Sequence, residues 1–419
     1  MAAAGFGPSL YQQYEGRVVA SVSLNGANVT KSHVIWREIE TQSGQPLSVE
    51  TLQDDFTRLE NLGIFASINV KVYAEAGHGR VLVGFDFVEM PWVIPMLKFK
   101  YTEQNGWSVG PALSSVNMLG YGVSLSASVV FGGTTQAVLE SRGPWFTTNR
   151  LRYNFRAALL DRYDTLNEFN ENSLEFTPWL SYFFNPTTQF GSMIGYFEMN
   201  SDVDGKTLSD DNRDQFGRAA VAGIYDSRNS WRNPTGGWWT ELEMGGYFGD
   251  GNWFQANLDF RRWQPLLPHH TLAMGALFSG QTGTVGVDMP EYLMYRMGGA
   301  NSIRGYDIDV LGRELFGQNQ TIVTAEYLFE VLPLQQWPVL NWAFSAGMQV
   351  AAFADYGNAW NNDDAHAIER GKFGGGFGLR FLVPGINVAR VDIGFGEGGR
   401  VFFHFGVWDK FTAQRLRLR

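Results

Sequence analysis

The apolar positions in the N-terminal part of the chain follow two different periods. Residues 17–26, 66–73 and 81–87 alternate apolar with polar side chains, which is the period of a strand with one buried face. Residues 31–40 predict a short helix and residues 48–63 a longer one. The pattern therefore predicts an α+β unit in the order strand, helix, helix, strand, strand. The predicted inward face of the first strand consists of Val18, Ala20, Val22 and Leu24.

The longer helix carries a start signal and a predicted core face. Ser48 precedes it and can cap its first turn, because a serine hydroxyl accepts a backbone N–H group that is otherwise unpaired there. Gly63 follows it and suits the left-handed backbone with which helices commonly end. Leu52, Phe56 and Leu59 recur at helical spacing, so we expect this face to pack against the strands.

In the rest of the chain, strand-like alternation replaces the helical period. Residues 149–159 carry apolar side chains on one face and Arg150, Arg152 and Arg156 on the other. Residues 254–261 repeat this arrangement, with apolar side chains at every even position and polar ones at every odd position. A soluble sandwich would not direct three arginines into its core. A strand with lipid on one side and a polar lumen on the other requires this pattern, because only a closed barrel satisfies every backbone group of a sheet in lipid.

The predicted fold is a transmembrane β-barrel of about 16 antiparallel strands with one N-terminal α+β domain. The mean spacing of roughly 20 residues suits strands of about ten residues joined by alternate short turns and longer loops. The segments lie near residues 93, 107, 120, 134, 149, 173, 188, 215, 237, 253, 270, 319, 343, 371, 387 and 400. The aromatic residues expected to form girdles at the two membrane interfaces are Trp179, Tyr182, Trp238, Trp239, Trp337 and Trp342.

Composition narrows the class of protein further. The chain has 419 residues, of which 15% are aromatic and 18% are charged, and it has no cysteine. The aromatic content excludes disorder, and the lack of cysteine excludes disulfides, thiol catalysis and cysteine-ligated zinc. The chain contains no run of about 18 consecutive apolar residues, so the sequence predicts no membrane-spanning helix. The net charge of −10 argues against nucleic-acid binding, which needs a basic face.

Two motifs and one domain carry a resemblance to a known family. The stretch GGANSIRGY, residues 298–306, places one arginine in a glycine-rich setting, and its SIRGY resembles a signature of the BamA-like superfamily of outer-membrane insertases and translocators. In that superfamily the signature lies at the tip of the longest extracellular loop. FADYG at 353–357 resembles the partner F-x-D-x-G motif on the second strand after the loop, and residues 17–91 resemble one POTRA domain.

The resemblance implies that the loop folds back into the barrel lumen. Arg304 would be held there by Asp355, with Glu326 as a further candidate on the intervening strand. An arginine suits this position because its planar fork can bond a carboxylate bidentately and stays charged. The predicted loop lock therefore consists of Arg304, Gly305, Asp355 and Glu326, and the predicted loop motif consists of Gly298, Gly299, Ile303 and Tyr306.

The resemblance also implies a layout and a function. We expect residues 1–16 to be a linker or fragment start, 17–91 a POTRA domain, 92–411 an outer-membrane β-barrel and 412–419 a basic C-terminal extension. Such a protein lies in the bacterial outer membrane with its POTRA domain in the periplasm, and it secretes or inserts polypeptide rather than acting as an enzyme. Its expected partners are outer-membrane lipid and a polypeptide client or fused passenger. The sequence leaves open whether the protein forms a homo-oligomer. No cofactor is expected.

Three alternatives remain for the particular role. One POTRA domain and a start, MAAAGFGPSL, without an export signal make the chain most similar to the translocator of a PlpD-type patatin-like autotransporter, whose lipase domain would precede Met1. The second alternative is a stand-alone insertase with one POTRA domain. The third alternative, a passive channel, is disfavoured by the paired loop motifs.

The first and last strands predict a weak seam in the barrel. Pro95, in the predicted first strand 92–101, cannot donate a ladder hydrogen bond and is tolerated mainly at a sheet edge. In a closed barrel the neighbour of this strand is the last strand, residues 400–406, which includes Phe403 and Phe405. The sequence therefore predicts a lateral gate between the two.

Four other motifs are assigned no site. GKT at 205–207 lacks the glycine that a phosphate-binding loop needs five positions earlier, and SDVDG at 201–205 fails the spacing of a calcium loop. His269 and His270 have no further obvious metal ligands. GWSVG at 106–110 matches a serine-hydrolase elbow, but no helical pattern follows it. We therefore predict no catalytic residue and no metal ligand.

Overall fold

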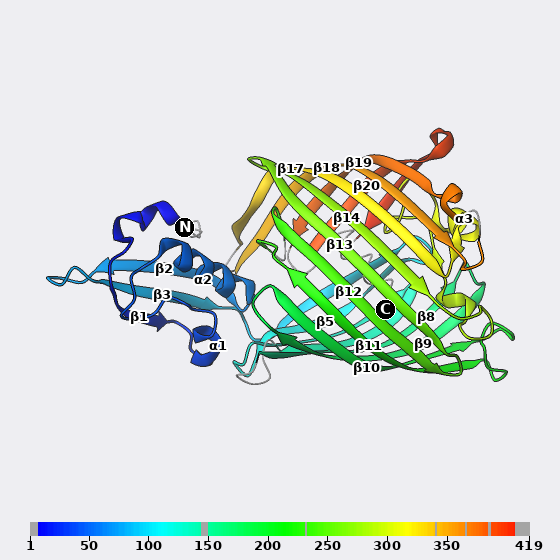
Figure 1. Cartoon of the computed structure of the whole chain (residues 1–419), viewed down its shortest axis with the longest axis horizontal. Helices are drawn as coiled ribbons and strands as arrows, with labels where there is room; N and C mark the ends of the chain where they lie inside the picture. Colours follow the sequence, from blue (N-terminus) through cyan, green and yellow to red (C-terminus); the bar gives the residue numbers. More distant parts are fainter. Residues whose placement is uncertain are drawn as a thin grey trace.

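The computed structural model describes residues 7–143, 150–230, 233–339, 342–364, 367–383 and 387–406. A small α+β domain lies beyond one end of a large barrel, and helix α3 (Ile308–Glu314) lies at the opposite end (Figure 1). In the described part of the chain, no helix is long and apolar enough to cross a membrane. The predicted C-terminal extension 412–419 falls outside the described residues.

The small domain has its elements in the predicted order, which confirms the α+β prediction. Its sheet order is β1-β3-β2, with β1 parallel to β3 and β2 antiparallel to it. The elements are β1 (Val19–Asn25), α1 (Ser32–Trp36), α2 (Val49–Asn61), β2 (Phe65–Ala74) and β3 (Val81–Glu89), preceded by 3-10 turns at Pro8–Leu10 and Gln12–Tyr14.

Helix α2 supplies the core of this domain. The Ser48 hydroxyl accepts a hydrogen bond from the backbone N–H of Thr51 at 3.2 Å, as predicted for the cap. Leu52, Phe56 and Leu59 are all buried and belong to one core cluster with the inward residues of the three strands. The predicted helix face is therefore confirmed.

The predicted inward face of β1 is wrong at its first position. Val18 is 41% exposed, whereas Val19 is 1% exposed and lies in the core. The pairing of β1 with β3 shifts register between Val19 and Ser21, and such a bulge adds one residue to the strand. The alternation of faces therefore changes phase there, while Val22 and Leu24 still pack against the core.

The remaining long strands form one antiparallel sheet, which within the described residues has sixteen strands and confirms the barrel prediction. Each predicted segment corresponds to one strand. The strands are β4 (Ile94–Thr102), β5 (Gly106–Met118), β6 (Val123–Gly132), β7 (Thr134–Gly143), β8 (Leu151–Asp164), β9 (Phe169–Phe183), β10 (Thr188–Ser201), β11 (Arg213–Asp226), β12 (Gly237–Gly249), β13 (Trp253–Leu267), β14 (His270–Gln281), β17 (Asn319–Val339), β18 (Trp342–Trp360), β19 (Lys372–Val383), β20 (Asn387–Phe395) and β21 (Val401–Gly406).

Strand β13 shows that the barrel is polar inside and apolar outside. Phe254 and Phe260 are 44% and 43% exposed, whereas Asp259 and Arg261 are 5% and 4% exposed. Buried charges need partners, and the guanidinium of Arg261 pairs with the carboxylate of Asp259. Exposed phenylalanines beside buried charges are what a wall between lipid and a polar lumen requires.

The predicted aromatic girdles are only half correct. Trp179 and Trp239 are 8% and 7% exposed and lie in apolar clusters inside the barrel. Tyr182 is 42% exposed, and the ring of Trp238 packs at a tilt against that of Phe260 on the outer face. Adjacent residues, and residues three apart, necessarily point to opposite faces of a strand, so each pair has one member inside. The side chains of Trp337 and Trp342 fall outside the described part.

The small domain is attached to the barrel at the turn between β5 and β6. The backbone N–H of Lys31 donates to the carbonyl of Gly120 at 2.9 Å, and Asn117 Nδ2 donates to the Thr30 hydroxyl at 2.7 Å. A Cβ on Gly120 would lie 2.0 Å from the carbonyl oxygen of Val29, so only glycine permits this approach. Close backbone contact therefore fixes the loop before α1 against the barrel.

Glu89 holds this loop in position. Its carboxylate accepts hydrogen bonds from the backbone N–H groups of Asn28, Val29 and Thr30, and from the Thr30 hydroxyl. Burial by itself raises the pKa of Glu89, but these hydrogen bonds outweigh it, so the pKa lies below the ordinary value. The folded domain therefore favours the ionised form of the Glu89 carboxylate.

We predict that residues 17–91 fold when expressed alone and that Phe56→Ala lowers their free energy of unfolding by about 3–5 kcal/mol, because it removes a buried aromatic ring. Circular dichroism during chemical denaturation measures this loss. The exposed substitution Leu82→Ala on β3 is the control and should have a much smaller effect, because Leu82 is 37% exposed. A segment that stays unfolded, or is purely β, would contradict the prediction.

We also predict that Glu89 makes this domain sensitive to acid. Because its pKa is lowered on folding, its contribution is complete above the unfolded value of about 4.3 and is lost as pH falls through the lower folded value. The melting temperature of the wild type should therefore fall more steeply between pH 5 and pH 2.5 than that of Glu89→Gln. Parallel pH profiles for the two proteins would exclude this role.

Candidate functional site

The long loop between β14 and β17 is built to enter the barrel. It contains a 3-10 turn (Glu291–Leu293), the short strands β15 (Tyr295–Arg296) and β16 (Phe316–Gly317), and α3. The carboxylate of Asp307 caps α3 by accepting from the backbone N–H of Asp309 at 2.8 Å. These local elements place the segment 298–306 against the inner wall.

Arg304 is completely buried at the tip of this segment. Its Nε and Nη2 donate to the two carboxylate oxygens of Asp355 at 2.8 and 2.9 Å, which is a bidentate pair. Its Nη1 donates to Glu326 at 2.5 Å and to Asp392 at 3.3 Å. Its guanidinium carbon lies 3.4 Å from the ring centroid of Phe353. The structure thus brings three of the four predicted lock residues together.

Two further arginines complete a balanced charge cluster. Arg380 donates to Asp392 at 2.5 Å and to Glu326 at 3.0 Å, and Arg390 lies 3.8 Å from Asp392. With Arg304 and Asp355, the cluster contains three cations and three carboxylates drawn from the loop and from the neighbouring strands β17 to β20. Asp392, Arg380 and Arg390 were not predicted from the sequence, although each is a charged residue at an inward position of a predicted strand.

The cluster keeps Arg304 charged despite its burial. Burial by itself lowers the pKa of Arg304, but the attraction of Asp355 and Glu326 outweighs it and raises the pKa above its ordinary value. A buried charge of this kind is stable only when its partners are present, because the cost of removing it from water is large. The arrangement therefore holds the loop by charge as well as by packing.

Glycines in the wall and in the loop allow this contact. A Cβ on Gly374 of β19 would lie 1.9 Å from the carbonyl oxygen of Arg304. Gly305 has a φ of +96°, and its Cβ would lie 2.5 Å from the carbonyl carbon of Phe395. The loop backbone therefore lies directly against β19 and β20, at a distance that side chains would prevent.

The other predicted loop residues fix the segment around Arg304. Ile303 is fully buried in a cluster with Met297 and Ile322. The hydroxyl of Tyr306 donates to the carbonyl of Phe373 at 2.9 Å and accepts from the backbone N–H of Glu397 at 3.0 Å. The Ser302 hydroxyl accepts from the backbone N–H of Gly298 at 2.7 Å, and the backbone at Gly299 packs beside Glu103.

The first and last barrel strands meet through side chains. Within the described residues, β4 and β21 are the two ends of the sheet order, with no backbone ladder between them. On the outer face, the ring of Phe405 lies 5.5 Å from that of Tyr101 and 4.8 Å from that of Trp107. Phe403 also points outward and is 75% exposed. Pro95 lies at the other end of β4, so the structure does not bring it to these aromatic residues.

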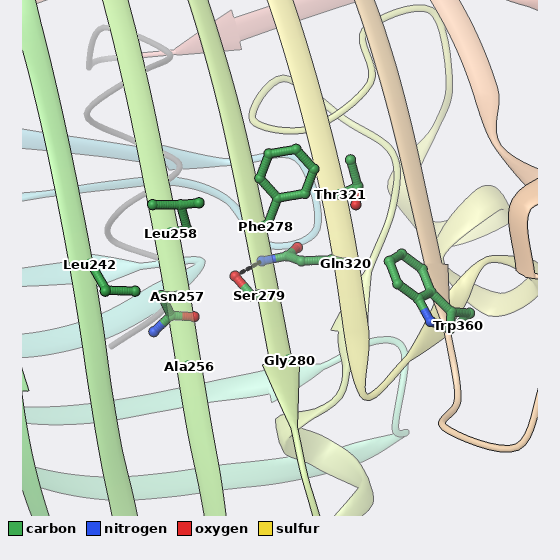
Figure 2. Close-up of a pocket in the computed structure, with 10 residues that line it drawn as sticks. All are labelled: Leu242, Ala256, Asn257, Leu258, Phe278, Ser279, Gly280, Gln320, Thr321 and Trp360. Carbon is green, nitrogen blue, oxygen red and sulfur yellow. Dashed lines mark hydrogen bonds between the residues drawn. The ribbon is translucent and has the colours of Figure 1, made fainter.

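A shallow depression on the barrel wall has no features of a polar binding site. Figure 2 shows Leu258 and Phe278 projecting from the wall, while Ser279 and Gln320 are joined by a hydrogen bond of 3.2 Å. The depression has a volume of about 300 Å³ and arises beside the small residue Gly280. Its outward side chains are apolar and suit contact with lipid chains. Among the described residues, no three or more His, Asp or Glu side chains are arranged so that they could hold a metal ion.

The fold and this site define a class of protein, namely an outer-membrane β-barrel of the translocator and insertase type with a periplasmic POTRA domain. An Omp85 superfamily domain matches residues 117–411, and a POTRA domain, described as a surface antigen variable number repeat, matches residues 18–90. The chain therefore belongs to the Omp85 superfamily, with its barrel in the outer membrane and its POTRA domain in the periplasm.

Solved structures of three relatives have a similar fold. BamA from Haemophilus ducreyi lacking POTRA domains 1–3 matches with a TM-score of 0.61 and 17% identity over 93% of this chain and 84% of that chain. CdiB from Acinetobacter baumannii matches with a TM-score of 0.53 and 13% identity over 94% and 73%. CdiB from Escherichia coli matches with a TM-score of 0.61 and 12% identity over 91% and 73%. No curated protein matches the chain.

We predict that the Arg304–Asp355 pair is energetically coupled. Arg304→Ala or Asp355→Ala alone should destabilise the folded barrel by about 3–5 kcal/mol, because each leaves a buried charge without its main partner. The double variant should lose less than the sum of the two single losses. Gel mobility of heated and unheated protein measures the folded fraction, and strictly additive losses would contradict the coupling.

Proposed function

We propose that this protein moves polypeptide across or into the outer membrane, with the Arg304 loop as an inner gate and the β4–β21 seam as a lateral one. The observation that carries this proposal is the combination of a loop buried in the lumen and a seam without a backbone ladder in the described residues. A loop held inside the lumen by a charge cluster disfavours a passive channel. In the described residues, both gates are held by side-chain contacts, which can break and form again while the barrel wall stays folded.

The POTRA domain supplies a surface for the client. In its sheet order β1-β3-β2, both β1 and β2 are edge strands. An extended polypeptide can add to a sheet edge through backbone hydrogen bonds, which makes recognition tolerant of client sequence. The tight attachment at Gly120 keeps this domain beside the periplasmic end of the barrel (Figure 1). A client captured there is close to the entrance.

The more specific proposal is that this barrel and POTRA domain are the translocator and anchor of a patatin-like autotransporter. It rests on the resemblance of residues 17–91 to one POTRA domain, which is the layout of such translocators. The competing proposal is a stand-alone insertase. The native reading frame upstream of residue 1 decides between them, because an in-frame α/β lipase module is required by the first and not by the second.

We predict that client transport requires the seam to open. The chain has no native cysteine, so a disulfide between Tyr101→Cys and Phe405→Cys, or between neighbouring positions, can be formed selectively. Transport should stop on oxidation and recover on reduction. It is measured as surface exposure of an epitope-tagged client in cells.

The matched control is a disulfide inside the wall. Val221 and Met244 face each other on the permanently paired strands β11 and β12, so a cysteine pair there should leave transport unchanged. Undiminished transport through a barrel that is fully cross-linked at the seam would exclude the lateral gate. Passage through the lumen past a displaced loop would then be the better account.

A further inference from the structure

Glu103 and His404 form a contact across the seam on its inner side. Glu103 lies in the turn that follows β4, and His404 lies on β21 with 3% of its side chain exposed. His404 Nδ1 and Glu103 Oε1 are 2.5 Å apart. The outer aromatic contact of Phe405 and this inner polar contact thus come from consecutive residues of β21, which point to opposite faces.

The same two side chains also hold the Arg304 loop. The backbone N–H of Gly305 donates to His404 Nε2 at 2.9 Å, and the backbone N–H of Ala300 donates to Glu103 Oε2 at 3.1 Å. Gly299 is required beside this carboxylate, because its Cβ would lie 2.2 Å from Glu103 Oε2. First strand, last strand and loop are therefore joined in one closed ring of hydrogen bonds.

The direction of these bonds fixes the protonation of the ring. A backbone N–H can only donate, so His404 Nε2 must accept with its lone pair. The proton of the neutral imidazole is then on Nδ1 and points to Glu103 Oε1. Glu103 thus accepts from His404 through one oxygen and from Ala300 through the other, as an ionised carboxylate can.

We infer that Glu103 and His404 are a latch that couples opening of the seam to release of the loop. Separation of β4 from β21 breaks the Glu103–His404 contact, and segment 298–306 can then keep its backbone hydrogen bond to only one of these two side chains. Conversely, withdrawal of the loop removes both backbone donors that orient these side chains. The lateral gate and the inner gate therefore open together rather than independently. This inference deepens the proposed function, since both gates belong to it.

The test is hydrogen–deuterium exchange of the purified full chain in lipid nanodiscs without any client. His404→Ala should accelerate exchange about tenfold in the loop 298–306 and also in β4, residues 94–102, neither of which contains the substitution. This factor is that expected for the loss of one or two hydrogen bonds. Acceleration confined to 401–406 would show a merely local role and would overturn the latch.

Glu103→Gln tests the latch from the other strand. His404 and Ala300 contact different oxygens of the carboxylate, and the amide replaces one of these oxygens with an NH2 group that can only donate, so one of the two contacts is lost. Exchange should rise in 298–306 and in β21. Because the Glu103 side chain is 21% exposed in a turn, this variant keeps the barrel core intact.

The matched control is Glu168→Gln. Glu168 also pairs a barrel turn with the long loop, through Arg313 of α3 at 2.8 Å, but it lies in the turn between β8 and β9 and is 60% exposed. This variant should affect exchange only near α3 and leave β4 and β21 unchanged. If it loosens the seam as much as Glu103→Gln does, any loop contact suffices and the latch is excluded. The exchange experiment contains no client, so it tests the latch alone. Whether the protein transports a client is decided separately by the seam cross-linking experiment.

Discussion

The structure depends on one buried charge. Arg304 has no exposed surface, and it is stable only because Asp355, Glu326 and Asp392 surround its guanidinium from three different strands. Moving this charge away from the wall is costly, because it leaves carboxylates without a partner in a confined space. The position of the loop inside the lumen follows from this electrostatic balance.

Glycines in the barrel wall leave room for the loop that carries Arg304. On β19 and β20 the residues next to the loop are glycines, so the loop backbone touches the strands themselves. Outside, the same strands present apolar side chains such as Phe377 to lipid. A strand in this barrel therefore carries three different requirements at once: lipid contact on one face, a polar lumen on the other, and empty space where the loop lies. Glycine in a strand usually weakens it, and here that cost is offset by the contact that it permits.

The seam differs from the rest of the wall in the kind of contact that closes it. Elsewhere, neighbouring strands share backbone ladders, which are numerous and cooperative. Between the described parts of β4 and β21, the contacts are side chains: aromatic rings around Phe405 outside, and Glu103 with His404 inside. A few side-chain contacts are worth far less than a ladder of backbone hydrogen bonds, so the described part of this boundary is held more weakly than the paired strands on either side of it. The inner contact, Glu103 with His404, also binds the loop segment 298–306. The seam and the loop are therefore held at the same place.

The sequence by itself determined the elements, because their signals are local. The alternation along each strand, the Ser48 cap and the apolar face of α2 depend only on neighbours within a few residues. The sequence did not predict which face of the strand a side chain occupies where that depends on distant contacts. The two examples are the bulge at Val19 and the inward position of Trp239. The partners Asp355 and Glu326 of Arg304 were predicted only through the family resemblance. The tertiary structure alone showed that Asp392 also meets Arg304 and that His404 joins Glu103, since these residues lie far apart in the chain and are brought together only when the loop enters the lumen and the barrel folds.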